Sequence, residues 1–337
     1  MNKYFIIIFI IISFIIGFSS GYFINGLLSN KNNQIVQPQQ TIVYTAATFA
    51  PFFNNIKNFF PFNYTVVSGG SVLLAQRISQ LNMSSDLYLT VDYTTIKNIL
   101  IRANRAYWYL IIGTAPMVLA YNQNNTPPEV KHLINIAQLA QKNFSMWKDL
   151  FDYLVSGKVK VGFGDPNLDP EGYRGLMVLE LAGMIFYNNQ SYYVYKLFNV
   201  TKSYVLGQNA PSLYPQLTSG YVDVLFTYSY DAKSHGFSYI LLPPQLNFGD
   251  PEYVNYYKQV KYVTSSNVTI QGDLIQVAVT IPSTAVNTNQ AEQIIIFMMT
   301  DEGKEILSDY GLFTYFKFYG NINSVPLPLR YYLSPFM

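Results

Sequence analysis

Apolar and polar positions along the chain repeat with two periods, one typical of strands and one typical of helices. Short apolar runs predict strands at 41–44, 87–91, 117–121, 159–162, 222–227 and 274–280. Apolar side chains at helical spacing predict helices at 51–60, 71–81, 94–100, 144–154, 172–186, 213–218, 290–299 and 303–309. This alternation indicates the βαβ rhythm of α/β domains with helices flanking the sheets.

The N-terminal segment differs from the rest of the chain. Met1-Asn2-Lys3 precedes an almost continuous apolar run from Tyr4 to Phe18, and weaker apolar character continues to Leu28. Residues 1–28 therefore predict either a cleaved signal peptide or an N-terminal membrane anchor, and the lack of a clean small-residue cleavage motif favours the anchor. Lys3 predicts that the chain after this segment is extracytoplasmic. Residues 29–40 are polar and irregular, as in a linker.

A chain of 337 residues predicts two compact units. The expected organisation is a first lobe beginning at 41–120, a second lobe at 121–232, a return to the first lobe at 233–318 and a C-terminal tail at 319–337. The last two predicted helices would pack back on the first lobe.

Composition removes several classes of function. Hydrophobic residues make up 50% of the chain and charged residues 12%, which opposes disorder, and the net charge of +2 is carried by scattered Lys and Arg, which opposes nucleic-acid binding. The chain has no cysteine, and its two histidines, His132 and His235, have no neighbour at metal-ligand spacing. No hydrolase, nucleotide or metalloprotease motif occurs, so we expect no enzyme and no resident cofactor.

Asn-x-Ser/Thr sequons support an extracellular glycoprotein only weakly, because an Asn-rich chain carries about four by chance. The seven sequons lie at Asn63, Asn82, Asn124, Asn143, Asn189, Asn199 and Asn267.

Four predicted strand-to-helix turns are rich in small and hydroxyl residues. They are 45–48, 68–71, 165–173 and 209–212. Helix starts present unpaired N–H groups and a positive dipole, and the carboxyl ends of strands meet at one edge of a sheet, so such turns predict an anion site that needs no Lys or Arg. The alternative is that Thr48, Ser71 and Ser212 are ordinary N-caps.

One of these turns resembles a known family. The segment Asp165-Pro166-Asn167-Leu168-Asp169-Pro170-Glu171-Gly172-Tyr173-Arg174 is similar to the Asp-Pro-Asn-x-Asp-Pro-Cys-Gly-Tyr-Arg segment of the archaeal-type molybdate/tungstate-binding proteins of ABC transporters. Shorter agreements lie at 69–72, 85–86, 91–93, 108–109, 117–121, 220–223, 228, 250–253 and 280–282. The resemblance covers about residues 41–315. It implies a two-lobe type II periplasmic-binding-protein fold, in which helices flank mixed sheets and the ligand cleft lies between the lobes.

The resemblance also implies a ligand site. It assigns Thr48, Gly70 and Ser71 of the first lobe, and Asp169, Tyr173, Ala210 and Tyr228 of the second, to contact with the anion. In the family, two carboxylates approach the molybdenum or tungsten. Asp169 matches the first, whereas the second falls at about Ala210, which has no carboxylate. Thr48 replaces a Ser of the family and Glu171 replaces a Cys.

We therefore expect an extracytoplasmic protein that closes two lobes on molybdate or tungstate and delivers it to an ABC permease. The missing second carboxylate keeps a receptor for sulfate or another oxyanion open as an alternative. A surface structural protein that has lost the ligand is the second alternative.

Overall fold

The computed structural model describes residues 40–265, 267 and 269–336. The predicted N-terminal signal or anchor and residues 29–39 of the predicted linker lie outside these residues. Within the described part of the chain, no helix is long and apolar enough to span a membrane.

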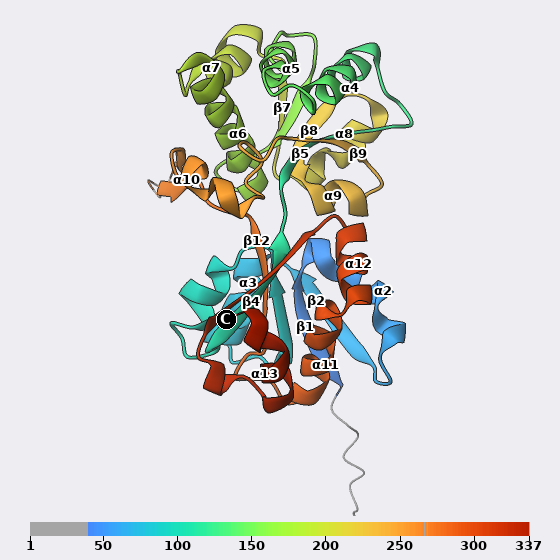
Figure 1. The fold of residues 1–337 in the computed structure, drawn as a ribbon, viewed down its shortest axis with the longest axis vertical. Helices are drawn as coiled ribbons and strands as arrows, with labels where there is room; N and C mark the ends of the chain where they lie inside the picture. Colours follow the sequence, from blue (N-terminus) through green and yellow to red (C-terminus); the bar gives the residue numbers. More distant parts are fainter. Residues whose placement is uncertain (1–39, 266, 268, 337) are drawn as a thin grey trace, which may run out of the picture. The chain divides into compact units, whose positions relative to one another are not determined.

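Lobe 1 is built on a six-stranded mixed sheet with the order β13-β4-β12-β3-β1-β2 (Figure 1). Its strands are β1 Thr41–Ala46, β2 Tyr64–Gly69, β3 Leu87–Thr90, β4 Trp108–Thr114, β12 Gln276–Thr280 and β13 Phe313–Gly320. Strand β1 pairs in parallel with β2 and β3, whereas β12 and β13 pair antiparallel.

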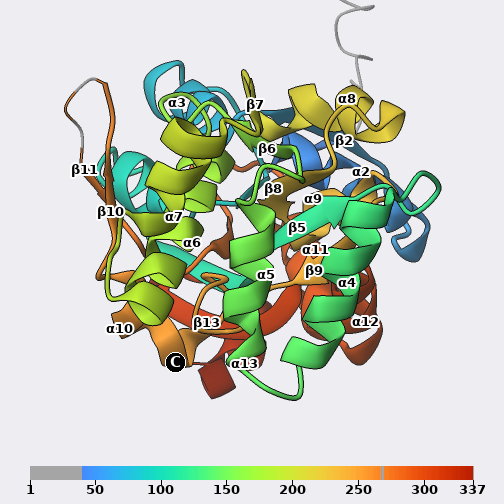
Figure 2. The same ribbon diagram turned by 90° about the horizontal axis from the view of Figure 1, so that it is seen from above.

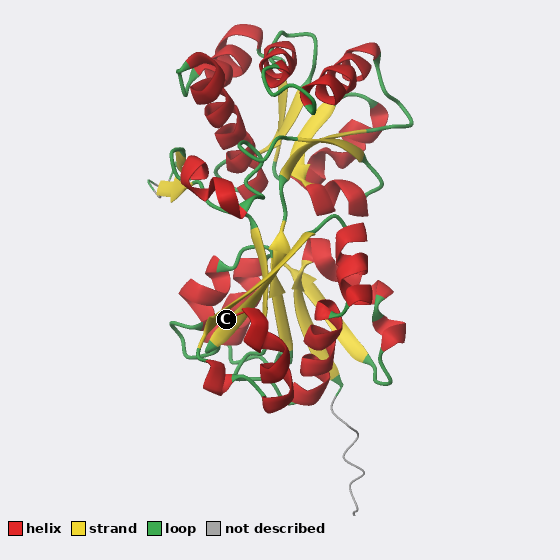
Figure 3. Cartoon of the chain, in the orientation of Figure 1, coloured by secondary structure: helices red, strands yellow, loops and turns green. Residues whose placement is uncertain are grey.

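Helices cover both faces of this sheet (Figure 3). They are η1 Ala47–Phe49, α2 Ala50–Asn55, η2 Lys57–Phe59, α3 Ser71–Gln80, η3 Ile96–Leu100, α11 Thr288–Met299, α12 Asp301–Asp309, η7 Ile322–Ser324, α13 Leu327–Leu333 and η8 Ser334–Phe336. Neighbouring residues of one strand belong to different cores: Tyr88 packs in a cluster with Leu74 of α3, and Leu89 in a cluster with Ile295 of α11. Burial on both faces explains why the strands read as continuous apolar runs.

Lobe 2 is built on a five-stranded sheet with the order β7-β6-β8-β5-β9. Its strands are β5 Met117–Tyr121, β6 Val161–Gly164, β7 Tyr204–Gly207, β8 Val224–Tyr228 and β9 Ser238–Leu241. Strand β6 is parallel to β7 and β8, and β5 is antiparallel to β8 and β9.

The helices of lobe 2 are α4 Pro128–Ala140, α5 Met146–Leu154, α6 Pro170–Tyr187, α7 Tyr192–Tyr195, η4 Lys196–Thr201, η5 Ala210–Leu213, α8 Tyr214–Ser219 and α9 Ser229–Ser234. Figure 2 shows α4, α5 and α6 side by side. Helix α6 starts with Asp169 as N-cap and Pro170 at its first position, where proline's missing N–H is harmless, and it stops at Asn188 in the left-handed region. The sequence thus encodes both ends of the helix that borders the site.

The chain passes between the lobes at two places. Ala115 and Pro116 join β4 to β5, and a longer segment with η6 Pro251–Tyr253, α10 Val254–Tyr257, β10 Lys261–Val263 and β11 Thr269–Gln271 leads from β9 back to β12. Backbone hydrogen bonds tie the two passages together, from Ala115 N to Ile275 O and from Met117 N to Asn247 O.

The sheets correct the expected lobe boundaries. Residues 117–120 belong to β5 of lobe 2, and β9 at Ser238–Leu241 stays in the lobe 2 sheet although we expected the return to begin at 233. Residues of the expected C-terminal tail complete β13 and form α13, which packs on α11 with Leu329 and Leu333 buried. The sequence of a strand does not determine which sheet it joins, because its backbone N–H and C=O groups can form hydrogen bonds in either sheet. The tertiary structure therefore decides these boundaries.

Candidate functional site

One cavity is lined by both lobes, at the carboxyl ends of β1, β2 and β8. It has a volume of about 700 Å³. Lobe 1 contributes Ala46, Ala47, Thr48, Gly69, Gly70, Ser71, Val72, Leu73, Gln76, Val91, Asp92 and Thr95, and lobe 2 contributes Leu168, Asp169, Pro170, Glu171, Arg174, Asn209, Pro211, Tyr228 and Tyr230. Residues from all four of the predicted turns therefore line this one cavity, which we call the cleft.

Two hydroxyl groups of lobe 1 reach the cleft without a partner. Thr48 lies in η1, and Ser71 is the first residue of α3. Thr48 Oγ1 and Ser71 Oγ are buried, and neither makes a hydrogen bond of ordinary geometry to another described residue, although the Tyr230 side chain lies near Thr48 and that of Tyr88 near Ser71. The N-cap of α3 is Gly70, and neither helix start has a side-chain cap bond, so the capping alternative is wrong for Thr48 and Ser71. A buried hydroxyl without a partner costs free energy unless a ligand supplies one.

Asp169 connects two turns of lobe 2. One carboxylate oxygen, Oδ1, accepts the N–H of Glu171 at 3.1 Å, as an N-cap does, and Oδ2 accepts the N–H of Ala210 at 2.8 Å. A Cβ at Gly164 would lie 1.9 Å from Asp169 Oδ2, so only glycine leaves room for this carboxylate. Asp169 is 8% exposed and lines the cleft. Its two oxygens are directed at backbone, which makes Asp169 a brace between the turns.

Two of the predicted site residues do not line the cleft. Ala210 is buried, and its N–H is already donated to Asp169. Its neighbour Asn209 caps η5 in a capping box with Ser212, which explains the hydroxyl at that position. Tyr173 instead lines a smaller adjoining cavity of about 160 Å³ and stacks on Tyr262, with ring centroids 6.1 Å apart. Thr48, Gly70, Ser71, Asp169 and Tyr228 do line the cleft.

Arg174 is the residue that sequence reasoning missed. Its guanidinium lines the cleft as well as the adjoining cavity, donates from Nη1 to Tyr228 Oη, and lies 5.5 Å from the ring centroid of Tyr173. The ion pairs of the described residues are Lys148–Asp152 and Lys304–Asp301, so Arg174 forms none there, although the charges of Asp92 and Asp169 act on it across the cleft. The cleft thus contains a cation, which the sequence analysis did not expect. The sequence did contain an indication of its role, because Arg174 is the last residue of the segment 165–174 that resembles the known family.

Lobe 2 has two buried carboxyl groups in this region: Glu171 lines the cleft, whereas Asp231 is fully buried and does not. Glu171 Oε2 accepts the N–H of Tyr228 at 3.3 Å. Burial, and then the charges of Asp231 and Asp169, raise the pKa of Glu171 well above its ordinary value. Burial raises the pKa of Asp231 to about 7. Among the described residues, no group of three or more His, Cys, Asp or Glu is arranged to hold a metal ion.

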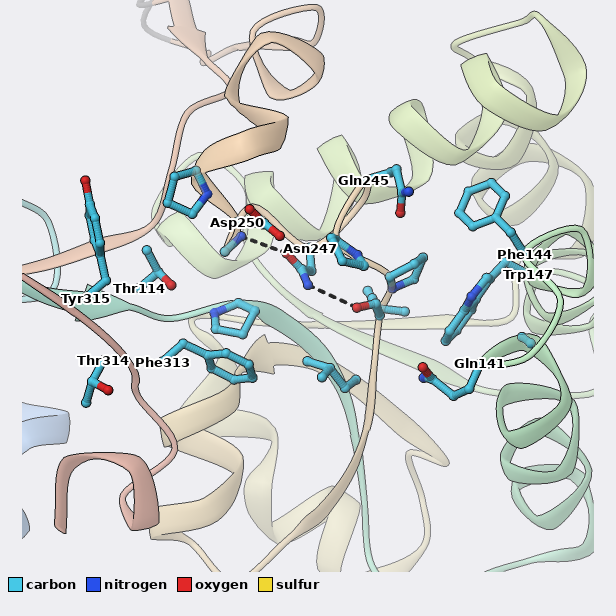
Figure 4. Close-up of a pocket in the computed structure, with 18 of the residues that line it drawn as sticks. Thr114, Gln141, Phe144, Trp147, Gln245, Asn247, Asp250, Phe313, Thr314 and Tyr315 are labelled. Atoms are coloured by element: carbon cyan, nitrogen blue, oxygen red, sulfur yellow. Dashed lines mark hydrogen bonds between the residues drawn. The ribbon is translucent and has the colours of Figure 1, made fainter. Parts of the chain in front are cut away.

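A second cavity, of about 590 Å³, lies where the chain crosses between the lobes (Figure 4). Aromatic rings and amides line it, including Phe144, Trp147 and Gln141. Asn247 holds its wall together, because Nδ2 donates to Leu242 O at 3.0 Å and Oδ1 accepts the N–H of Gly249 at 2.8 Å. Asn247 is thus satisfied internally, and Gln245 Oε1, a buried wall atom without a partner, can only accept a hydrogen bond. The cleft instead presents two hydroxyl groups that can donate to an anion. The cleft is the better candidate site.

Known proteins share this fold and this sequence pattern. The family model of bacterial extracellular solute-binding proteins matches residues 42–313. The molybdate/tungstate-binding protein of Thermococcus kodakarensis is 28% identical over 72% of this chain and 70% of its own length. An uncharacterized solute-binding protein of Methanococcus aeolicus is 30% identical over 72% of each chain.

Solved structures confirm the two-lobe α/β fold. The periplasmic molybdate-binding protein of Azotobacter vinelandii aligns with a TM-score of 0.51 at 16% identity, over 81% of this chain and 98% of its own. The sulfate-binding protein of Mycobacterium tuberculosis aligns with a TM-score of 0.51 at 12% identity, over 88% of this chain and 91% of its own. Because the family model matches residues 42–313, this chain belongs to the family of bacterial extracellular solute-binding proteins.

Proposed function

We propose that this solute-binding protein captures a tetrahedral oxyanion on the extracytoplasmic side and delivers it to an ABC permease. Molybdate and tungstate are the leading candidates for the anion. The observation that carries the proposal is the meeting of Thr48 Oγ1, Ser71 Oγ and Arg174, which forms no ion pair with a described residue, in one cleft. Hydroxyl donors and a guanidinium fork are the groups that bind oxyanions. The name of the Thermococcus kodakarensis relative supports molybdate and tungstate.

The lobes would close on the anion about the two passages at Ala115–Pro116 and the segment before Ile275. Closure would bring the lobe 1 hydroxyls and Arg174 to opposite sides of the ligand and exclude water, which strengthens each charge-assisted bond. The N-terminal segment, as an anchor or a cleaved signal, stays a prediction.

A sulfate receptor is the second candidate, and one observation favours it. A molybdenum or tungsten centre can take an added carboxylate oxygen, whereas sulfur in sulfate cannot. Both oxygens of Asp169 accept backbone N–H groups, and no carboxylate stands at Ala210. We therefore assign Asp169 no bond to the anion's central atom, and the described site then recognises only the anion's oxygens and charge.

Isothermal titration calorimetry with tungstate, molybdate, sulfate and phosphate in turn tests the proposal. Binding of tungstate and molybdate alone would support it, binding of sulfate or phosphate would reassign the solute, and binding of none would favour the structural alternative. An anion present at 100 times its dissociation constant should also stabilise the protein by about 2.7 kcal/mol.

Arg174→Gln is the sharpest variant for this test. A lost hydrogen bond to a charged group is worth about 1.5–3 kcal/mol, so the dissociation constant should rise about 10- to 100-fold. Arg102→Gln is the matched control, because Arg102 is exposed on lobe 1 and the variant changes the net charge equally. Equal affinities of the two variants would remove Arg174 from the site.

A further inference from the structure

The two buried carboxyl groups, Glu171 in the cleft wall and Asp231 outside the lining, come from different elements of lobe 2. Glu171 lies in the first turn of α6 and Asp231 near the start of α9 (Figure 1). Glu171 is 5% exposed and Asp231 is 0% exposed. Each carboxyl group shifts the pKa of the other as a neighbouring side chain. Glu171 is also the position at which the segment 165–174 departs from the family that it resembles.

Neither carboxyl group has a cation. The ion pairs of the described residues involve neither Glu171 nor Asp231, and Arg174 donates to Tyr228 instead. Both Oδ atoms of Asp231 accept no conventional hydrogen bond from another described residue. The titratable groups that act on the pair are Asp169 from α6, Tyr214 from α8, Tyr228 from β8, Tyr230 from α9 and Tyr310 after α12. None of these is a cation, and the one histidine beside them, His235, has its Nδ1 2.9 Å from the backbone oxygen of Asp231.

Two ionised carboxylates cannot share such a site. Burial disfavours each charge, and repulsion between the neighbouring carboxylates disfavours the second even more. Carboxylates accept hydrogen bonds but cannot donate them, so the contact between Glu171 and Asp231 becomes a hydrogen bond only when one of them carries a proton. A proton on Glu171 would give the buried oxygens of Asp231 a donor, in addition to the neighbouring Tyr230 hydroxyl.

We propose that Glu171 and Asp231 share a proton at the wall of the cleft, and that entry of an oxyanion draws a second proton from the solvent onto Asp231. The second half of this inference rests on the proposed function. An incoming dianion adds negative charge beside the pair, which favours the protonated form. The charges balance, because one solvent proton becomes the new O–H of Asp231 and partly offsets the charge of the anion.

The raised pKa of Asp231, about 7, supports the geometric argument. Below that pH both groups hold protons before the anion arrives, and above it one proton must be taken up. Linkage then requires the affinity to fall as pH rises, by at most tenfold per pH unit for one proton. Solute would therefore bind tightly in acidic surroundings and leave more readily in alkaline ones.

Calorimetry measures this proton directly. Titrations of the full-length protein with tungstate and with sulfate, in buffers of different ionisation enthalpy, give the protons taken up per anion from the dependence of the observed enthalpy on the buffer. We expect up to about one proton near pH 8 and about none near pH 5. Asp231→Asn should take up none and should bind with an affinity independent of pH. Asp149→Asn, which neutralises an exposed acid of α5, should behave like the wild type.

Wild-type binding without proton uptake at any pH, or wild-type uptake by Asp231→Asn, would overturn the coupling. The shared proton itself has a readout that needs no ligand. A protonated carboxylic acid has its own infrared C=O stretch, which we expect at neutral pH in the ligand-free wild type and not in the double variant Glu171→Gln/Asp231→Asn. If the protein binds none of the anions but shows this band, the proposed function fails and the pair stands; absence of the band overturns the pair.

Discussion

The bond between Asp169 and Ala210 can be isolated because the chain contains a natural control. Asp250-Pro251-Glu252 repeats the sequence Asp169-Pro170-Glu171, and Asp250 Oδ1 accepts the N–H of Glu252 at 2.9 Å, as Asp169 Oδ1 accepts the N–H of Glu171 at 3.1 Å. Asp169 alone adds a bond to a distant turn, from Ala210 N at 2.8 Å. Replacing each aspartate by alanine therefore removes the same cap, and in one case also the brace.

The magnitudes follow from these contacts. Asp250→Ala should lower the free energy of unfolding by about 1 kcal/mol, the usual value of an N-cap. Asp169→Ala should lower it by about 2–4 kcal/mol, because the buried N–H of Ala210 loses its partner at a further cost of about 1–3 kcal/mol. Urea denaturation of both variants measures the difference. Equal losses of stability would refute the brace.

The same variant tests how Asp169 acts on the anion. A brace positions both turns whatever the anion is. Asp169→Ala should therefore lower the affinity for tungstate and the affinity for sulfate by similar factors, as measured by calorimetric titration. A loss for tungstate at least about tenfold larger than for sulfate would instead establish a bond to the metal centre, as the resemblance implies.

Three further predictions concern single positions. Ser71→Ala should weaken oxyanion binding about 10- to 100-fold and change the free energy of unfolding by less than about 0.5 kcal/mol, because the Ser71 hydroxyl has no partner of ordinary geometry in the protein. Calorimetry measures the affinity and denaturation measures the stability, with Ser79→Ala of the same helix as the control. Gly164→Ala should destabilise the protein by about 1–3 kcal/mol, since its Cβ would collide with Asp169, whereas Gly70→Ala has open space; thermal denaturation of the pair decides. Asp231 holds its proton more tightly in the folded state, so the free energy of unfolding should fall by at most about 4 kcal/mol as pH rises from about 4 to about 7. In Asp231→Asn, the free energy of unfolding measured by denaturation should change less across that pH range.

Much of the local structure could be predicted from the sequence. The strands expected at 41–44 and 117–121 correspond to β1 and β5, and the helix expected at 172–186 lies within α6. These elements have strong signals of their own: β-branched or fully apolar runs, and a helix with a capping aspartate and a proline at its start. Strand β13, a run rich in aromatic residues near the C-terminus, was missed because it has no regular alternation and its pairing with β4 depends on distant residues.

The sequence by itself determined the helix starts, the small and hydroxyl residues of the turns, and the segment at 165–174 that carries the resemblance. These are local properties, decided by neighbouring residues along the chain. Only the tertiary structure decided that Arg174 faces the cleft while Tyr173 turns to an adjoining cavity, and that Ala210 N–H serves Asp169. It also brought Asp231 against Glu171, two carboxyl groups 60 positions apart in the chain, and their shared burial gives them the chemistry that neither has alone.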